Sequence, residues 1–299
     1  MKTISEKLHE KQKTHQESVL NNADSRKISR TWFKKDTVDF WRHNKMRKLV
    51  LPIVEYFPDS SWLTVGDGRY GTDANFLLNY GVKVHASDIQ DKLLRIGNEK
   101  GFIKNFSKQN AEELTFQNDE FDFVYCKESY HHFPRPSIAV YEMLRVAKKG
   151  IMLQEPKDPL FLETPWQSLL WYVKEFIKFI LKIRSEKHPF EESGNYVYSL
   201  SPRELQKFAL GINCRFIAYT VQQDYYIKGV EFEKKERQSK LFKKIKRIVW
   251  LLELLYKIGL ATSGLMTGII LKDIPDEKLI SNLKKSGYKT EILTKNPYT

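Results

Sequence analysis

Residues 66–71 have the types and spacing of a ligand-binding turn. The segment Gly66-Asp67-Gly68-Arg69-Tyr70-Gly71 follows a short apolar run and precedes a helix-like segment. Glycine adopts backbone conformations that other residues resist, and its missing side chain lets a ligand approach the main chain closely. The helix that follows presents unpaired N–H groups to whatever occupies the turn. The same spacing fits a dinucleotide-binding turn, so the turn alone leaves the cofactor open.

Asp88 is a candidate for binding a ribose. It follows the glycine turn by about 20 residues and ends a predicted strand, as the ribose-binding carboxylate of a nucleotide site does. A carboxylate there can accept hydrogen bonds from both ribose hydroxyls while the rest of the ligand lies over the turn. An acidic residue at a strand end can also cap a helix. Its distance from the turn favours the ribose.

Two adjacent histidines could do acid–base chemistry. His131 and His132 follow the apolar run 121–126, inside the segment 127–133. An imidazole titrates near neutral pH, which suits a general base that removes a proton from a hydroxyl or an amine. Loop histidines also often only pack or bond the backbone, so both interpretations stay open.

Alternating strands and helices must position these residues. Apolar runs predict strands at 63–65, 82–87, 106–110, 121–126 and 151–153, and helices at 74–80, from 91 onward, and at 136–147 with a stop at Gly150. Such alternation implies a mainly parallel sheet covered on both faces by helices. Ligands of these sheets bind beyond the carboxyl ends of the strands, so the turn, the aspartate and the histidines would line one crevice.

Residues 61–156 resemble a class I S-adenosylmethionine-dependent methyltransferase of the type 11 group. The resemblance rests on five ordered segments: Val65-Gly66-Asp67-Gly68; Asp88; Asn110-Ala111-Glu112-Glu113-Leu114; Phe121-Asp122-Phe123-Val124 with His131-His132-Phe133; and Glu142-Met143-Leu144-Arg145-Val146-Ala147-Lys148-Lys149-Gly150. A nicotinamide-dependent enzyme would account for the first two only. The resemblance implies a Rossmann-like, doubly wound, mainly parallel sheet of seven strands, with helical insertions in the C-terminal half.

The resemblance also implies S-adenosylmethionine as the cofactor and assigns residues to it. The residues expected to bind it are Val65, Gly66, Asp67, Gly68, Gly71, Asp88, Ile89, Asn110, Ala111, Lys127, Glu128 and Tyr130. The glycine turn would hold the methionine end, Asp88 the ribose, and Asn110 with Ala111 the adenine. His131 and His132 are the catalytic candidates, although an amine or a carbanion needs only alignment with the methyl group. No metal is expected.

Two positions depart from the family pattern. Thr64 stands where the family usually has an acidic residue, two places before the first glycine, and Tyr70 stands where many members have glycine. Asp67 is the candidate to supply the missing carboxylate for the amino group of the cofactor.

The remaining chain is predicted to add helices around this domain. The expected division is a flexible polar leader at 1–30, an N-terminal helical lid at 31–60, and the methyltransferase domain at 61–299, with insertions at about 160–200 and 231–262. In the first insertion, an apolar stripe from 166 to 181 predicts a helix that either packs on the core or contacts a membrane surface or hydrophobic substrate. In the second, the basic run 234–247 leads into an apolar helix, which either docks on anionic lipid or enters the core. Ser201 and Glu204 predict a capping box, followed by strands at 215–221 and 265–271.

Charge and composition limit the setting and the partners. Fifty Lys and Arg residues against 37 Asp and Glu give a net charge of +13, which favours acidic partners without choosing among them. Two cysteines, a polar N-terminus and no apolar run near 18 residues predict a cytoplasmic protein, with peripheral membrane contact left open. The expected activity is methyl transfer to a small-molecule, glycan or lipid-linked acceptor. The alternatives are an RNA methyltransferase and a non-catalytic binding subunit with the same fold.

Overall fold

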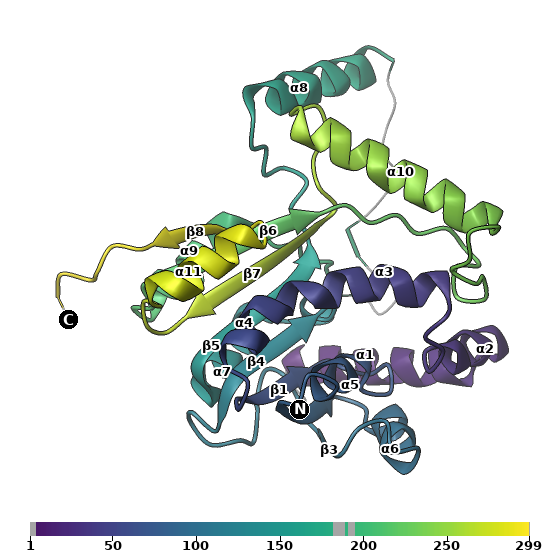
Figure 1. Ribbon diagram of the computed structural model, residues 1–299, viewed down its shortest axis with the longest axis vertical. Coiled ribbons are helices and arrows are strands. Elements are labelled where there is room, and N and C mark those ends of the chain that lie inside the picture. The colour runs from purple at the N-terminus through teal and green to yellow at the C-terminus, as the bar shows by residue number, and fades with distance from the viewer. Residues whose placement is uncertain (1–3, 182–188, 191–194, 299) are drawn as a thin grey trace.

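One mixed sheet organises residues 4–181, 189–190 and 195–298, the part of the chain that the computed structural model describes (Figure 1). Within that part the sheet has eight strands in the order β3-β2-β1-β4-β5-β7-β6-β8. The strands are β1 Ser61–Val65, β2 Lys83–Asp88, β3 Asn105–Lys108, β4 Phe121–Lys127, β5 Ala147–Pro156, β6 Phe216–Gln222, β7 Leu265–Leu271 and β8 Lys289–Ile292.

The sheet is parallel over its first five strands, as predicted. β3, β2, β1, β4 and β5 pair in parallel, whereas β7 runs antiparallel to both β5 and β6. The predicted count of seven strands omits β8, which pairs antiparallel with β6 at the sheet edge. The sequence of β8, Lys-Thr-Glu-Ile, is short and mostly polar because an edge strand buries little side-chain surface. It therefore carries no apolar signal.

Helices cover both faces of the sheet, because the side chains of each strand alternate between the faces. In β1, Leu63 and Val65 join the cluster that holds α7 (Pro136–Val146) and α9 (Pro202–Gly211). Trp62 joins the opposite cluster. That second cluster is covered by α4 (Leu51–Tyr56), α5 (Thr72–Leu78), α6 (Lys92–Glu99) and α11 (Glu277–Lys285).

Two local predictions around these helices have different outcomes. The predicted stop of the helix at Gly150 is wrong, because α7 ends at Val146 and Gly150 lies inside β5. A Cβ at Gly150 would lie 2.3 Å from the carbonyl oxygen of Ile270, so the glycine admits the neighbouring strand β7. The predicted capping box of α9 is confirmed, since the Ser201 side chain accepts from the Glu204 amide and the Glu204 carboxylate accepts from the Ser201 amide.

The N-terminal residues differ from the expected flexible leader. Residues 4–31 form α1 (Ile4–Asn21) and α2 (Ala23–Thr31), and the Asn22 side chain caps α2. Beyond them lie α3 (Val38–Arg47), a 3-10 turn (Lys48–Val50) and α4, whose first turn contains Pro52. A proline in a first helical turn costs no hydrogen bond, so Pro52 is compatible with the start of α4.

Two helices project away from the body of the sheet. α8 (Pro165–Ile180) and α10 (Lys240–Lys257) lie one above the other, with α8 farther from the sheet (Figure 1). Trp166 and Phe176 of α8 are each 62% exposed, so the interpretation of this helix as packed on the core is wrong. Among the described helices, none is both long and apolar enough to cross a membrane. The division into leader, lid, domain and insertions stays a prediction.

Candidate active site

A cavity of about 420 Å³ opens at the carboxyl ends of β1, β2 and β4. This volume lies within the range of small-molecule sites, about 300–1,000 Å³. The residues predicted from the sequence that line it are Val65, Gly66, Asp67, Gly68, Asp88, Ile89, Asn110, Ala111, Lys127, Glu128, His131 and His132. The sheet order reverses between β1 and β4, which is where ligands of doubly wound sheets bind.

Two of the predicted cofactor-binding residues lie outside this lining. Gly71 precedes α5 with φ +75°, and a Cβ there would lie 2.6 Å from the Ile103 side chain. Its role is therefore to let the turn pack on Ile103. Tyr130 is 1% exposed and belongs to the core, where its ring contacts that of Tyr198.

The glycine turn is held against the segments that follow β2 and β4. Gly66 has φ +75°, and a Cβ there would lie 2.3 Å from the Cβ of Ser129. The Ser129 hydroxyl donates to the Gly66 carbonyl oxygen at 2.7 Å. A Cβ at Gly68 would lie 2.9 Å from Asp88 Oδ2, so only glycine lets this carboxylate lie against the turn.

Asp88 is a buried carboxylate that suits a ligand with hydroxyl donors. Burial, opposed by hydrogen bonds from the Gln90 and Gly68 amides, raises its pKa to about 6. The Gln90 amide donates to Oδ1 at 2.8 Å. A vicinal diol would donate further hydrogen bonds to the ionised form, which water cannot solvate well at this depth. The residues present therefore fit the ribose of the expected cofactor.

The pKa of Asp88 predicts that cofactor affinity depends on pH. Ribose hydroxyls stabilise the ionised carboxylate, so binding should lower this pKa and release a proton near pH 6. We expect affinity to be constant well above pH 6 and about tenfold weaker at pH 5. Calorimetric titration across this pH range measures the change. Asp88→Asn should flatten the profile, and a variant profile as steep as the wild type would assign the proton to another group.

Asp67 lines the cavity, but groups of the protein itself already engage the carboxylate that was predicted to hold the amino group of the cofactor. Its carboxylate accepts from the amides of Asp73 at 3.1 Å and Ala74 at 2.8 Å, and so caps the start of α5. It also accepts from the Thr64 hydroxyl at 3.0 Å. Burial and the Asp73 carboxylate raise the pKa of Asp67 to about 8. Thr64, which departs from the family pattern, thus supplies a hydroxyl that holds the Asp67 carboxylate in its capping position. The Asp67 carboxylate is directed at helix α5.

Tyr70, the second residue that departs from the family pattern, packs the glycine turn against the N-terminal segment at Trp32 and Phe33. Its backbone has φ 60°, the left-handed region that glycine would occupy without strain. The ring packs on Phe33 with centroids 4.3 Å apart and on Trp32 at 5.9 Å. Aromatic contacts of this kind are worth about 0.5–1.5 kcal/mol each beyond area burial and offset part of the strain.

The N-terminal helices supply cavity residues that were not predicted from the sequence. Arg47 of α3 lines the cavity and donates from Nε to Asp73 at 2.5 Å and from Nη2 to Thr72 at 2.9 Å. His9 of α1 and Trp32 also line it. A buried arginine beside the glycine turn can pair with a carboxylate such as that of a methionine moiety. The sequence of α3 also contains Arg42, His43 and Lys45, so it carried no signal that singled out Arg47.

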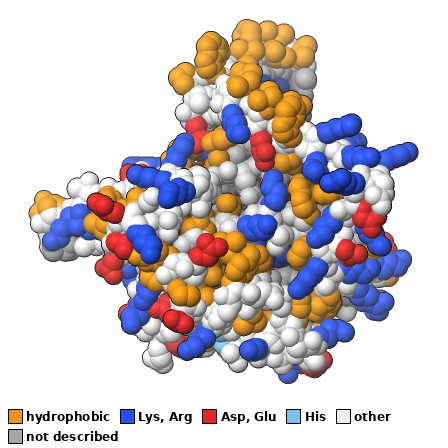
Figure 2. Space-filling model, in the orientation of Figure 1, with side chains coloured by type: hydrophobic (Ala, Val, Ile, Leu, Met, Phe, Trp, Pro, Cys, Tyr) orange, Lys and Arg blue, Asp and Glu red, His pale blue; other side chains and the backbone are white. Residues whose placement is uncertain are grey.

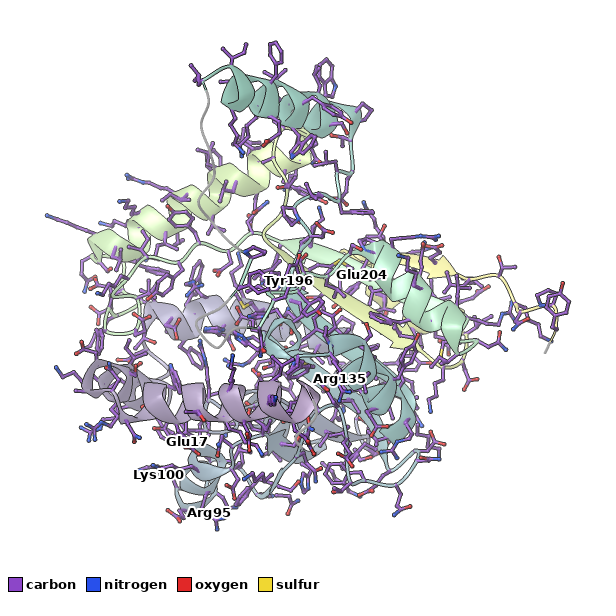
Figure 3. All side chains as sticks on the ribbon, turned by 180° about the vertical axis from the view of Figure 1, so that it is seen from behind. Glu17, Arg95, Lys100, Arg135, Tyr196 and Glu204 are labelled. Carbon is purple, nitrogen blue, oxygen red and sulfur yellow. The ribbon has the colours of Figure 1, made fainter. Side chains whose placement is uncertain are left out.

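Helix α1 borders the cavity through His9 and is held to the domain at two points; Figure 3 shows this helix with Glu17 labelled. Near its start, His9 Nε2 lies 3.3 Å from Glu112, which also receives Arg135 Nε at 2.7 Å. Farther along, Glu17 accepts from the Gln90 amide group at 3.1 Å. These polar contacts explain why a segment without apolar periodicity is ordered as a helix.

A charged network from α3 borders the cavity beside β4. His43 Nδ1 lies 2.9 Å from Lys127 Nζ and 3.1 Å from Glu128 Oε2. Burial would raise the pKa of Glu128, but the neighbouring charges of Lys127 and His43 hold it well below its usual range. Glu128 also has φ 50°, and strained backbone of this kind clusters at functional sites.

The structure distinguishes the two histidines. His131 Nδ1 lies 2.6 Å from Glu155 Oε2, and Glu155 is fully buried at the end of β5. Glu155 Oε1 accepts from the amides of Ser129 at 2.9 Å and Tyr130 at 3.0 Å, which fixes the carboxylate. His132 is exposed, with its ring centroid 4.0 Å from that of His131. Glu155 was not predicted, although an acidic residue at the end of a buried strand was its signal.

Known proteins resemble the part of the chain that builds this site. Residues 63–153 match a family described as a methyltransferase domain. A demethylmenaquinone methyltransferase of Renibacterium salmoninarum is 28% identical over 128 residues, 42% of this chain and 54% of that protein. Another demethylmenaquinone methyltransferase, of Staphylococcus carnosus, is 28% identical over 200 residues, 62% of this chain and 78% of that protein. A crystal structure of a SAM-dependent methyltransferase from Archaeoglobus fulgidus is 16% identical, with a TM-score of 0.45, over 76% of this chain and 94% of that one.

These matches concern the domain. The chain spans about half the length of the Renibacterium relative. The family match, together with the sheet order, confirms the predicted methyltransferase domain with its class I fold. It is consistent with S-adenosylmethionine as the cofactor.

Proposed function

We propose that this protein, whose residues 63–153 belong to the methyltransferase-domain family, transfers a methyl group from S-adenosylmethionine to a small or lipid-linked acceptor. The observation that carries the proposal is one cavity lined both by Asp88 and by His131, whose ring is held by Glu155. The first group suits the ribose of the cofactor, and the second suits removal of a proton from the acceptor.

The cavity residues divide the tasks of binding and reaction. Asp88 would accept hydrogen bonds from the ribose hydroxyls of the cofactor. Asn110 and Ala111 would flank its adenine, and Arg47 would pair with its methionine carboxylate. The bound cofactor supplies a methyl group on a positively charged sulfur. Lys127 and Glu128 line the cavity beside β4 and would border the space in front of that sulfur.

His131 is the proposed general base. With Nδ1 bonded to Glu155, the proton of the neutral ring sits on Nδ1 and Nε2 is the basic nitrogen. As the acceptor attacks the methyl carbon, Nε2 would take the acceptor's proton, and the buried Glu155 carboxylate would stabilise the resulting imidazolium. For an acceptor that carries no proton to lose, His131 would act through position and polarity alone.

Aromatic residues lie next to the part of the site where the acceptor is proposed to bind. Tyr130, Tyr196 and Tyr198 form a ring cluster next to the histidine segment, with the last two centroids 4.9 Å apart. The Asn195 amide joins this cluster to the site by donating to the His132 carbonyl oxygen at 3.0 Å. Relatives named demethylmenaquinone methyltransferases support an acceptor of the hydroxylated ring or quinone class. A planar ring could stack on Tyr196, which is 46% exposed.

Titration calorimetry of the intact protein with S-adenosylmethionine tests the proposal. We expect one binding site per chain, and S-adenosylhomocysteine competing for it. Transfer of a radiolabelled methyl group is then measured separately into an organic-solvent extract containing hydroxylated quinones and into RNA. Folded protein that does not bind the cofactor would contradict the methyltransferase assignment. Label that enters RNA alone would favour an RNA methyltransferase.

A further inference from the structure

Helix α8 exposes a broad stripe of apolar side chains along its length. They include Trp166, Leu169, Val173, Phe176, Ile177 and Ile180, all classed as exposed. An exposed helix of a water-soluble protein normally has an apolar face toward the core and a polar face toward water. α8 instead exposes its apolar face, while Lys174 and Lys178 lie on another face, which indicates that another apolar phase covers the apolar one.

The exposed side of α10 continues this surface. Trp250 is 63% exposed, and Leu251 and Leu254 are also exposed. We call the exposed apolar side chains of α8 and of residues 250–258 the apolar tip. Figure 2 shows it as the hydrophobic summit of the molecule, away from the sheet. Contiguous exposed apolar surface of this kind marks an interaction site.

The apolar tip is fixed to the domain by polar contacts at its base. The Thr164 hydroxyl donates to the Gly259 carbonyl oxygen at 3.2 Å, and the Gln167 amide donates to the Ala261 carbonyl oxygen at 2.8 Å. The first half of α10 packs on α3 through Ile245 and Val249, which are buried with Val38. The two helices therefore present the tip from a packed base.

Cations gather beside the apolar tip. Lys240, Lys243, Lys244 and Arg247 line one shallow concavity on α10, a turn or two before Trp250. Figure 2 shows Lys and Arg side chains on the shoulder next to the hydrophobic summit. Cations that flank tryptophan and aliphatic side chains match an anionic bilayer surface, where the head groups attract charge and the acyl boundary accepts apolar groups.

We propose that the apolar tip inserts into the interfacial region of a bilayer and that the α10 cations contact anionic lipid head groups. Insertion removes the exposed side chains of α8 from water, and the cations add attraction that a neutral apolar partner would not supply. Since none of the described helices can span a bilayer, the contact is peripheral. A second copy of the chain fits less well, because pairing two tips would bring two sets of these cations together.

Docking would also bring the active site to the membrane. Asn195 follows α8 in the sequence, and its side chain donates to the His132 carbonyl oxygen beside the cavity. An acceptor embedded in the bilayer could then reach His131 without leaving the bilayer completely. The docking itself does not depend on methyl transfer, and its test reads out lipid binding alone.

Vesicle co-sedimentation of the full chain tests the proposal. We expect binding to phosphatidylcholine vesicles that contain about one quarter phosphatidylglycerol, and much weaker binding to phosphatidylcholine alone. The double variant Phe176→Ser with Ile180→Ser should lower the affinity at least about tenfold, because insertion of two side chains is lost. The double variant Lys243→Glu with Lys244→Glu should lower it by about tenfold or more on anionic vesicles.

Matched variants elsewhere on the surface serve as controls. Leu210→Ser with Ile212→Ser removes two exposed apolar side chains at the end of α9. Lys284→Glu with Lys285→Glu makes the same charge change in the last turn of α11. Both should bind vesicles like the wild type. All four double variants change exposed residues, and circular dichroism with thermal melting checks that each is folded.

Four results would overturn the proposal. Wild-type protein that does not sediment with anionic vesicles would do so, as would control variants that lose as much affinity as the tip variants. Light scattering that shows a dimer, converted to a monomer by Phe176→Ser with Ile180→Ser, would assign the apolar tip to a second copy. Binding of RNA that replaces vesicle binding and depends on Lys243 and Lys244 would assign the cations to nucleic acid.

Discussion

Replacing His131 by alanine should lower the turnover number for a hydroxyl acceptor by about 10²–10⁴, the usual contribution of a general base. Cofactor affinity should change little, because the ribose is expected to bind Asp88 at the end of β2. His131 lies elsewhere in the cavity lining, where Glu155 holds its ring. Single-turnover transfer of a labelled methyl group, together with calorimetric titration of each variant, separates the two quantities.

The neighbouring histidine offers a matched control for this experiment. His132 is exposed, and Glu155 contacts the ring of His131 instead. His132→Ala should therefore retain most of the activity, while added imidazole should restore part of the rate of His131→Ala. Wild-type turnover by both alanine variants would remove the base hypothesis and leave alignment as the source of the rate.

Replacing Asp88 by alanine should weaken cofactor binding by roughly 1.5–3 kcal/mol, or about 10–150-fold, the cost of losing hydrogen bonds to a charged group. The fold should survive the change. Because burial raises the pKa of Asp88 to about 6, its ionised form costs stability at neutral pH, and this cost is absent in the variant. Calorimetric titration at pH 7.5 and a thermal melt measure both effects.

Asp91→Asn is the control for that measurement. Asp91 lies three positions further on, pairs with Arg95 at 2.8 Å, and is not among the residues that line the cavity. Its variant should bind the cofactor like the wild type. Equal affinity of the Asp88→Ala and wild-type proteins would show that the carboxylate does not hold the ribose, even if methyl transfer persists.

The order of strands and helices around the glycine turn could be predicted because each buried strand carries its own local signal. The runs 63–65 and 121–126 are apolar, and both form central strands. Residues 4–31 and 289–292 lack such runs, because the contacts that order them are polar or lie at a sheet edge. Their helices and strand therefore depend on partners distant in the sequence.

The individual site residues divide in the same way. Gly66, Gly68, Asp88 and the histidine segment could be placed together because parallel strands end at one edge of a sheet. The direction of the Asp67 carboxylate could not, since the α5 amides and Thr64 compete for it in three dimensions. Nor could the choice between His131 and His132, which depends on Glu155, 24 residues from His131 and on strand β5.

The sequence by itself determined a mainly parallel sheet with a glycine-rich ligand-binding turn, because strand periodicity and glycine spacing are local properties of the chain. The methyl donor came from the resemblance to a known family. Only the tertiary structure decided that Asp67 caps a helix, that Glu155 orients His131, and that Arg47 reaches the cavity from α3. It likewise decided that the apolar stripe of α8 faces outward. The physical reason is the same in each case. A hydrogen bond or a buried face requires two segments, and the sequence of neither segment alone specifies how close together they lie in space.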